Sequence, residues 1–404
     1  MLYVSQYFVR DDQPGGVRHW HHTRALAEAG HEVSVVTSFV QHKERTIAER
    51  YRGRRVVRER EEGIDVWRVY STPGYGRDMR SRLASYGTFA WWALVAGMRA
   101  ARPDVVVASS PSLPAAAGAA LVARARGARF LLEVRDLWPD SAVAMGLVSD
   151  PRTIALARRL ERFCYRRAER VVALTEGIRD GVVAAGVSPA RVTLITNGID
   201  LPEPGATYVT NGAAPVPAPD DAFVAMYVGQ HGTYNALGTV LDAAERLGGE
   251  PGIRFVLVGG GDRKSALVQE AQRRRLSNLS FVDPVPKREV PSWLARADAC
   301  LLPYQDRALF AGALPNKVFD YLGAGRPIVA SAPEGELTRL VRDAGCGLNA
   351  PPEDGAALAD AVRRLAADRP AAERMGAAGA AYARERYDRR VLAARFVSVV
   401  ESLA

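Results

Sequence analysis

Short apolar runs alternate with longer Ala- and Arg-rich stretches along the first half of the chain. The runs are rich in β-branched residues and predict strands at residues 2–9, 33–37, 66–70, 105–108, 130–134, 171–174 and 192–195. The stretch 17–29, between the first two runs, predicts a helix that ends at Gly30. Strands and helices that alternate in this order are typical of βαβ units, so the pattern predicts an α/β fold with a parallel sheet.

The second half of the chain repeats this alternation. It predicts strands at residues 223–228, 254–258, 279–282, 299–302 and 327–330. Between the halves, residues 203–221 are rich in Pro, Gly, Ala and Asn and lack periodicity, which indicates an interdomain linker. The closing segment from residue 356 is strongly helical, with breaks near Pro370 and Tyr387.

The length and composition fit two domains. A chain of 404 residues exceeds the size at which one hydrophobic core usually keeps growing. We therefore expect a first domain over residues 1–202, a second domain over 222–385, and a closing helix over 386–404 that packs back on the first domain. With 48% hydrophobic and 25% charged residues, the composition is that of a folded globular protein.

The charge balance favours anionic partners. Lys and Arg outnumber Asp and Glu by 54 to 45, which gives a formal charge of +9. Nucleotides, sugar phosphates, acidic lipid surfaces and nucleic acid all fit this sign, and the sign alone does not choose among them.

The cysteines and the first residues favour a cytoplasmic protein. Cys164, Cys300 and Cys346 lie far apart and form no CxxC pair, which argues against a disulfide framework and a zinc site. The first residues lack the pattern of a signal peptide. The apolar stretch 89–98 is too short to span a bilayer, so the surrounding region Arg77–Arg102 could at most rest on the inner face of a membrane.

Glycines and charged residues mark two loops of the first domain. Ligands of parallel sheets bind at the carboxyl ends of the strands, where these loops lie. Gly15 and Gly16 follow the first strand and would let a phosphate or sugar approach the backbone, although a tight turn explains them equally well. Glu133, Arg135 and Asp136 end the fifth strand. Either an Arg–carboxylate pair fixes that loop, or Asp136 or Glu133 contacts the sugar or the acceptor.

Three histidines surround Trp20 in the first predicted helix. His19 and His22 share one helical face, as the ligands of a metal site would. No carboxylate or cysteine joins them at ligand spacing. We therefore favour histidines on the helix surface near an anionic ligand, and we expect no metal.

Two glycine loops in the second domain are candidates for binding a diphosphate. Gly229, His231 and Gly232 follow the first strand of that domain, so their backbone could face a phosphate. A second glycine run leads into Arg263 and Lys264. Each loop alone could be a mere turn, but two such loops, one of them with two cations, favour binding.

The segment 314–328 carries the most informative pattern. Pro315 suits the first position of a helix, which leaves the amides of Asn316 and Lys317 pointing outward as an anion site. Asp320, about one turn further on, would accept hydrogen bonds from ribose hydroxyls. The segment predicts a clamp for a nucleoside diphosphate; the alternative is an amphipathic helix with an exposed lysine.

Taken in order, these segments resemble the retaining glycosyltransferases of family 4, which have the GT-B fold. The resemblance covers nearly the whole chain and points to the bacterial branch that builds O-antigen, capsule and related glycans or natural products. Its components are the Gly15-Gly16 loop, AGHEV at 29–33, RPDVVV at 102–107 with SSP at 109–111, EVRDLWP at 133–139, NGID at 197–200, and the segment 315–327.

The resemblance implies two Rossmann-like domains that face a central cleft. The first would hold a glycan, polyprenyl-linked or small-molecule acceptor, and the second a nucleoside-diphosphate sugar, most often UDP-linked. On this resemblance we expect no metal ion, no other cofactor and no nucleic-acid partner. The departing phosphate would take the acceptor proton, so that no protein nucleophile is needed and the anomeric configuration is retained.

The residue patterns and the resemblance together give the candidate residues. Those expected around the reacting atoms are Gly16, Glu133, Arg135 and Asp136. Those expected around the donor are Gly15, Gly16, Gly229, His231, Gly232, Arg263, Lys264, Pro315, Asn316, Lys317 and Asp320. The resemblance implies Gly16 near the donor phosphates, the loop 229–232 near the diphosphate and Asp320 on the ribose.

The chain departs from the family pattern at charged positions. The paired-glutamate motif would place its first Glu at Gly312, and an Arg and a Lys that many members carry align with Gln230 and Ala236. A common histidine of the first domain falls at Arg135. Lys317, with Arg263 and Lys264, thus becomes the candidate that neutralises the diphosphate.

Three functions stay open on these residues. The leading one is glycosyl transfer. A GT-B-fold epimerase or hydrolase would act on the same donors without an acceptor, and a catalytically silent auxiliary homologue would account for the missing charges.

Overall fold

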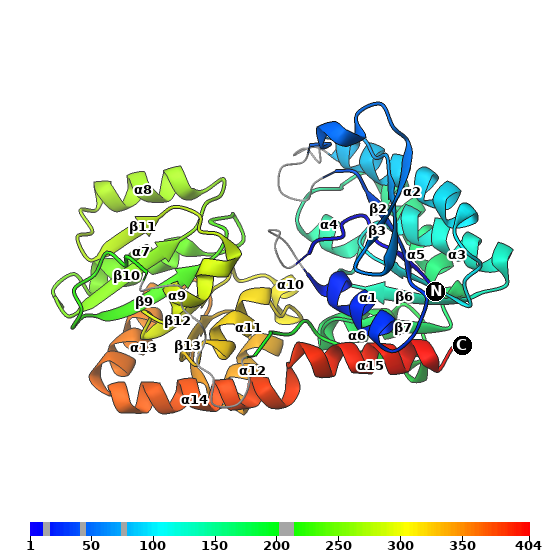
Figure 1. The fold of residues 1–404 in the computed structure, drawn as a ribbon. Helices are drawn as coiled ribbons and strands as arrows, with labels where there is room; N and C mark the ends of the chain where they lie inside the picture. The colour runs from blue at the N-terminus through cyan, green and yellow to red at the C-terminus, as the bar shows by residue number, and fades with distance from the viewer. Residues whose placement is uncertain (11–16, 41–45, 74–78, 202–213) are drawn as a thin grey trace. The chain divides into compact units, whose positions relative to one another are not determined.

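The computed structural model describes residues 1–10, 17–40, 46–73, 79–201 and 214–404. They form two compact units, one made of Met1–Thr196 with Arg390–Ala404 and the other of Asn197–Arg389. Each unit is a sheet with helices on both faces (Figure 1). The predicted pair of parallel α/β domains is therefore confirmed.

The sheet of the first unit has the strand order β3-β4-β2-β1-β5-β6-β7-β8. The strands are β1 (Leu2–Val4), β2 (Ser34–Ser38), β3 (Val56–Glu61), β4 (Ile64–Val69), β5 (Val105–Ser109), β6 (Arg129–Val134), β7 (Arg170–Ala173) and β8 (Val192–Leu194). All neighbours are parallel except β3, which pairs antiparallel with β4. The sequence did not indicate β3, because this edge strand is mostly charged and only partly buried.

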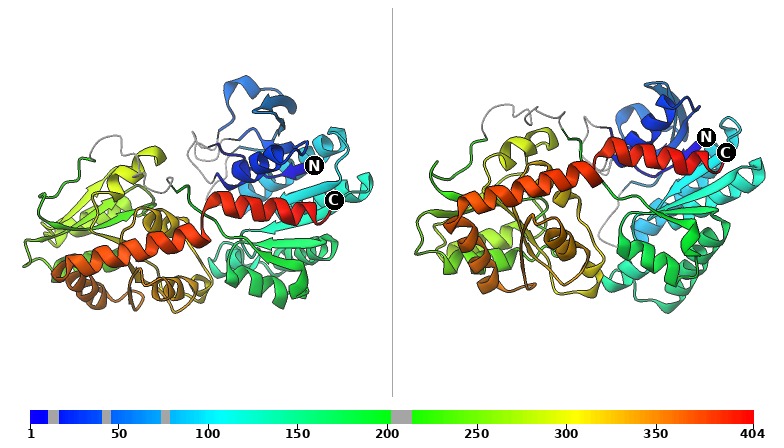
Figure 2. Two further views of the ribbon diagram at one scale, coloured as in Figure 1. Left: turned by 60° about the horizontal axis from the view of Figure 1, so that its bottom comes forward. Right: turned by 90° about the horizontal axis from the view of Figure 1, so that it is seen from below.

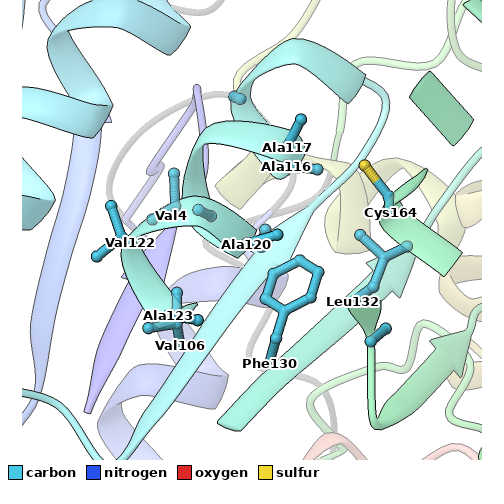
Figure 3. Close-up of a cluster of buried hydrophobic side chains, with 14 of the residues drawn as sticks. Val4, Val106, Ala116, Ala117, Ala120, Val122, Ala123, Phe130, Leu132 and Cys164 are labelled. Carbon is cyan, nitrogen blue, oxygen red and sulfur yellow. The ribbon is translucent and has the colours of Figure 1, made fainter. Parts of the chain in front are cut away.

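Helices cover both faces of this sheet. They are α1 (Arg18–Glu28), α2 (Met79–Arg99), α3 (Leu113–Arg126), α4 (Asp140–Ala144), α5 (Pro151–Arg167) and α6 (Glu176–Ala184), with 3₁₀ turns η1 (Glu49–Tyr51) and η2 (Pro189–Arg191). On one face, α2, α3 and α5 enclose a core in which the alanines of α3 approach Val106, Phe130 and Leu132 (Figure 3). On the other face, Trp20 and Leu26 of α1 share a second core with Leu392 and Phe396.

The second unit has six parallel strands in the order β11-β10-β9-β12-β13-β14. The strands are β9 (Phe223–Val228), β10 (Ile253–Val258), β11 (Leu279–Val282), β12 (Ala299–Pro303), β13 (Ile328–Ser331) and β14 (Gly347–Ala350). The sequence did not indicate β14, which contains a single large apolar residue, Leu348.

Helices also flank this second sheet. They are α7 (Leu237–Arg246), α8 (Lys264–Arg273), α9 (Val290–Leu294), α10 (Ala308–Ala311), α11 (Asn316–Gly323), α12 (Glu336–Asp343), α13 (Gly355–Ala367) and α14 (Arg369–Arg386), with the 3₁₀ turn η3 (Lys287–Glu289). One core lies between the sheet and α11 with α12, and a second lies between the sheet and α7 with α13.

The last helix, α15 (Arg389–Glu401), belongs to the first unit from Arg390 onward. It lies beside α1 (Figure 2), where Phe396 packs on Tyr3 and on the stacked ring of His22. The predicted return of the closing helix to the first domain is confirmed.

The first unit ends earlier than residue 202. Ile199 bridges Asp388, and the Arg389 guanidinium donates to the carbonyl of Gly198. Residues 197–201 therefore belong to the second unit. Of the expected linker 203–221, residues 203–213 lie outside the described residues, and Ala214 already contributes to the core of the second unit.

Candidate functional site

The loops after β9 and β10 and the start of α11 meet in the second unit around Lys317. The Lys317 ammonium donates to the Tyr227 hydroxyl at 2.7 Å and to the Asn235 Oδ1 at 3.1 Å. It also lies 4.2 Å from the centre of the Tyr227 ring. The sequence singled out Lys317 but missed both partners, because nothing in their local pattern tells which side chain they face.

The charge of Lys317 has no carboxylate partner within the part of the chain that the structure describes. Its side chain is partly buried, and desolvation lowers the pKa of Lys317 to about 7. Desolvation disfavours the charged form of a lysine, so the ammonium gives up its proton more readily than in water. An anion that approached the ammonium would offset this penalty, so the geometry favours an anionic ligand.

Glycine is required where the two loops approach each other. A Cβ on Gly229, whose φ is +157°, would lie 3.1 Å from the Lys317 Nζ. A Cβ on Gly259, whose φ is +145°, would lie 1.8 Å from the carbonyl oxygen of Gly229. A side chain at Gly229 would also occupy the space next to the ammonium.

The ring of His231, whose backbone was predicted to face a phosphate, is closed to a ligand. Its side chain is fully buried beside Tyr227 and Phe281, and neither ring nitrogen has a hydrogen-bond partner. Burial, together with the charges of Lys264 and Lys317, lowers the pKa of His231 to about 4. Its backbone joins the two loops, because its N–H donates to the Gly260 carbonyl at 2.8 Å and its carbonyl accepts from the Arg263 N–H at 3.0 Å. Its role near a phosphate stays a prediction.

Lys264 is a correction to the predicted set of donor ligands. Its ammonium donates to the carbonyls of Gly259 and Val282, each at 2.9 Å, and to the Asp283 carboxylate at 2.7 Å. All three N–H bonds are thus in use, which fixes the loop and leaves no donor for a diphosphate. Arg263 is exposed just before α8, and Gly232 is buried in the loop before α7. The predicted contacts of both residues with a diphosphate stay predictions.

The start of α11 differs from its predicted form by one position. Pro315 is extended and stands before the helix, so that Asn316 is its first residue. The Asn316 side chain accepts from Asn197 at 2.6 Å. Asp320 holds Lys287, whose ammonium is 2.6 Å from both carboxylate oxygens. The role of Asp320 on a ribose stays a prediction, and a ribose bound there would share this carboxylate with Lys287.

Glu133, at the end of β6, is a second correction, because it was predicted near the reacting atoms. The carboxylate is fully buried and accepts from Arg18 at 2.7 Å and from the Tyr3 hydroxyl at 3.2 Å. Burial alone would raise the pKa of Glu133, but Arg18 and His19 hold that pKa well below its usual range. An Arg–carboxylate pair does fix this region, but the arginine comes from α1, and Glu133 is closed to substrate.

His19 and His22 of α1 are buried and do not lie on the helix surface as expected, whereas His21 is only partly buried. The ring of His19 contacts the hydroxyls of Ser5 and Ser109 at 3.1 and 3.0 Å, and His22 stacks on Phe396 with ring centres 4.0 Å apart. Burial lowers the pKa of both imidazoles. Within the described ranges, no three His, Cys, Asp or Glu side chains are grouped as metal ligands.

Arg135 and Asp136 follow Glu133 and are only partly buried. The Arg135 N–H donates to the Ser110 hydroxyl at 2.8 Å, and its guanidinium lies 3.3 Å from the His19 Nε2. Burial lowers the pKa of Arg135 and raises that of Asp136. Among the predicted charged residues of this loop, these two can meet a substrate. Gly15 and Gly16 lie outside the described residues.

Two protein families match consecutive parts of the chain. The family described as glycosyl transferase 4-like domain matches residues 15–198, and the family described as glycosyl transferases group 1 matches residues 222–368. The colanic acid biosynthesis glycosyl transferase named WcaI, from Escherichia coli K12, is 29% identical over 320 residues, which are 76% of this chain and 77% of the relative.

Solved structures of similar proteins extend over the whole chain. HepE from Anabaena, in complex with UDP, has a TM-score of 0.70 at 16% identity and covers 99% of both chains. The sucrose-phosphate synthase from Thermosynechococcus elongatus has a TM-score of 0.71 at 18% identity, over 100% of this chain and 98% of that one. At these identities the likeness concerns the fold.

Proposed function

Because the chain belongs to the family 4 glycosyltransferases with the GT-B fold, we propose that it transfers a sugar from a UDP-linked donor with retention of anomeric configuration. The acceptor would be a glycan, a lipid-linked glycan or a small natural product, held by the first unit. The donor proposal draws on the Anabaena neighbour, whose structures include complexes with UDP and with UDP-glucose.

The observation that carries the proposal is the uncompensated charge of Lys317. Its ammonium is oriented by Tyr227 and Asn235 and is not paired with a carboxylate in the described chain. During transfer, negative charge develops on the departing diphosphate. A fixed cation in partly desolvated surroundings stabilises that charge more in the transition state than water would. Lys317 therefore takes the place of the charges that are absent at Gln230 and Ala236.

The proposed chemistry needs no metal and no protein nucleophile. The acceptor hydroxyl attacks the anomeric carbon on the face that the diphosphate is leaving, and a phosphate oxygen takes the proton of that hydroxyl. Asp136 and Arg135, at the carboxyl end of β6, would contact the reacting sugar or the acceptor. Charge on Lys317 and the helix amides of α11 would substitute for a divalent cation at the diphosphate.

Thermal stabilisation by a panel of UDP-, dTDP- and GDP-sugars tests the donor class. We expect an increase in melting temperature with UDP-sugars that is lost in Lys317→Met and kept in the exposed control Arg374→Gln. No stabilisation by any nucleotide sugar would contradict the proposal. NMR of the product formed with a matching acceptor then gives the anomeric configuration, and inversion would contradict retention.

A second function is favoured by one observation, the absence of a free positive charge at three positions of the donor loops. Lys264 is consumed by its loop, and Gln230 and Ala236 carry no charge. A silent auxiliary homologue would bind a UDP-sugar without turnover until a partner protein is added. A hydrolase or epimerase would consume the donor at its full rate without an acceptor. Turnover that requires an acceptor and no partner excludes both.

A further inference from the structure

Within the described ranges, large apolar side chains are exposed on the first unit and not on the second. Among the described residues, every exposed large hydrophobic side chain belongs to the first unit. Trp91 is 62% exposed and Leu156 is 68% exposed, far more than a packed residue. Leu83 and Met98 share α2 with Trp91, and Leu121 lies on α3. The two others, Val143 and Val391, are on α4 and α15.

These side chains lie on a single layer of helices. The helices α2, α3 and α5 cover the same face of the first sheet (Figure 1), and their inner residues share one core. Helix α3 packs against both of its neighbours. The exposed residues of the three helices therefore point away from the sheet, toward the same side of the unit.

The same helices are strongly basic. Their sequences contain many arginines and a single carboxylate, Glu161, which is buried. Arg99, Arg124, Arg159 and Arg162 are exposed. The nearby Asp140 on α4 is already paired with Arg158. The layer thus presents positive charge without exposed carboxylates of its own.

Apolar and basic residues alternate on this layer at helical spacing. Arg124 follows Leu121 by one turn on α3, and Arg159 follows Leu156 by one turn on α5, so each pair shares a face. On α2, Arg99 is next to Met98 near the helix end. We call the residues Trp91, Met98, Arg99, Leu121, Arg124, Leu156 and Arg159 the basic–apolar face.

We propose that the basic–apolar face binds the surface of a membrane that contains anionic lipids. Tryptophan and large aliphatic side chains favour the boundary between headgroups and acyl chains, and arginines beside them attract anionic headgroups. No helix in the described part of the chain is long and apolar enough to cross a bilayer, so the contact is with the surface. This attachment goes beyond sugar transfer and does not depend on it.

The distribution of charge favours lipid over a protein partner. The buried centre of a protein interface is depleted in charged residues and forms a continuous apolar patch. Here every helix of the layer places an exposed arginine close to its exposed apolar residue. A headgroup region accepts that mixture, because phosphates meet the guanidinium groups while the apolar side chains reach the acyl boundary.

Vesicle flotation with the full chain tests the proposal without any sugar donor. Wild-type protein should float with vesicles of phosphatidylcholine and phosphatidylglycerol and remain below with pure phosphatidylcholine. The variant Arg99→Gln/Arg124→Gln/Arg159→Gln should bind about a hundredfold more weakly, since each basic residue near an anionic surface contributes roughly a fivefold factor. Trp91→Ala should weaken binding without changing its dependence on phosphatidylglycerol.

A matched control removes the same charge elsewhere. Arg246, Arg364 and Arg374 are exposed on helices of the second unit, and their triple Gln variant should bind as the wild type does. Equal loss in both triple variants would overturn the proposal, because it would show a response to net charge alone. Wild-type protein that binds neither vesicle would also overturn it. So would a wild-type dimer in light scattering that Trp91→Ala converts to a monomer.

Discussion

Replacement of Lys317 by Met tests the donor site most directly. Methionine has a similar length and an apolar stem but no charge, so the side chain still fills its place while the ammonium and its contacts with the Tyr227 and Tyr304 rings are lost. A hydrogen bond from a charged group contributes about 1.5–3 kcal/mol. The Kd for UDP-glucose should therefore rise by about tenfold to 150-fold.

The lowered pKa of Lys317 gives this substitution a second signature. In the free protein, desolvation lowers the pKa of Lys317 to about 7, from an ordinary value of 10.5. A bound diphosphate favours the charged ammonium, so binding raises that pKa and takes up a proton. The affinity of the wild type for UDP-glucose should fall as the pH rises above about 7, by up to about tenfold per pH unit.

Isothermal titration calorimetry measures both quantities. UDP-glucose is a suitable ligand because both of its phosphates are esterified and do not titrate near neutral pH. Titrations in two buffers with different ionisation enthalpies give the number of protons taken up on binding. Lys317→Met should bind with weak, pH-independent affinity and no proton uptake, and Arg374→Gln should behave as the wild type does.

The neighbours of Lys317 do not produce this signature. Burial and two nearby lysines lower the pKa of His231 to about 4, and burial raises the pKa of Tyr227 far above its usual range. Neither group titrates between pH 7 and the alkaline limit of the experiment. Wild-type affinity that stays constant across that range, without proton uptake, would refute the assignment of Lys317 to the diphosphate.

Three further substitutions separate structural from functional roles. Glu133→Gln leaves the buried Arg18 without its carboxylate and should lower the free energy of unfolding by about 3–5 kcal/mol; an unchanged urea midpoint would contradict this. Asp320→Ala should weaken UDP-glucose binding by about 1–3 kcal/mol, measured by calorimetry, and affinity equal to the wild type would exclude the ribose contact. Phe396→Ala removes a buried ring that stacks on His22 and should lower stability by about 3–5 kcal/mol, and an unchanged melting temperature would show that α15 is not anchored there.

The fold follows from the apolar runs because buried parallel strands are apolar on both faces. Runs such as 105–108 and 223–228 became β5 and β9 with nearly the predicted bounds. The exceptions are β3 and β14, whose neighbours in the sheet hold them in place although their own sequences carry little apolar signal. Edge pairing of this kind is decided by tertiary contacts rather than by local pattern.

The candidate site was only partly predictable for the same reason. The pattern before α11 identified Lys317, because a cation at the start of a helix is a local feature. Whether a charged group is free depends on partners far along the chain, such as Asp283 for Lys264 and Arg18 for Glu133. Tertiary packing decides which of these side chains meet, and the local sequence pattern around each residue does not contain that information.

Glu133 and Lys317 illustrate how burial distinguishes a structural charge from a functional one. Both are removed from water, but Glu133 has the Arg18 guanidinium and the Tyr3 hydroxyl as partners, whereas Lys317 has only neutral ones. Removal of one partner from a buried ion pair leaves the other charge uncompensated and destabilises the fold, whereas removal of a buried charge that has no charged partner relieves a penalty that a bound anion would otherwise relieve. The two substitutions should therefore have opposite effects on stability.

The pH dependence of stability follows from the two pKa shifts. The pKa of Glu133 is lowered from its ordinary value of 4.5, so its contribution is present above that pH and is lost in acid. The loss caused by Glu133→Gln should shrink as the pH falls. For Lys317, the folded chain binds fewer protons than the unfolded chain between pH of about 7 and 10.5, so the wild type gains stability with rising pH there. The stability gained by Lys317→Met relative to the wild type should be largest below about pH 7, where the folded protein bears the full desolvation penalty of the ammonium. A variant less stable than the wild type at that pH would mean that the ammonium is already compensated in the free protein.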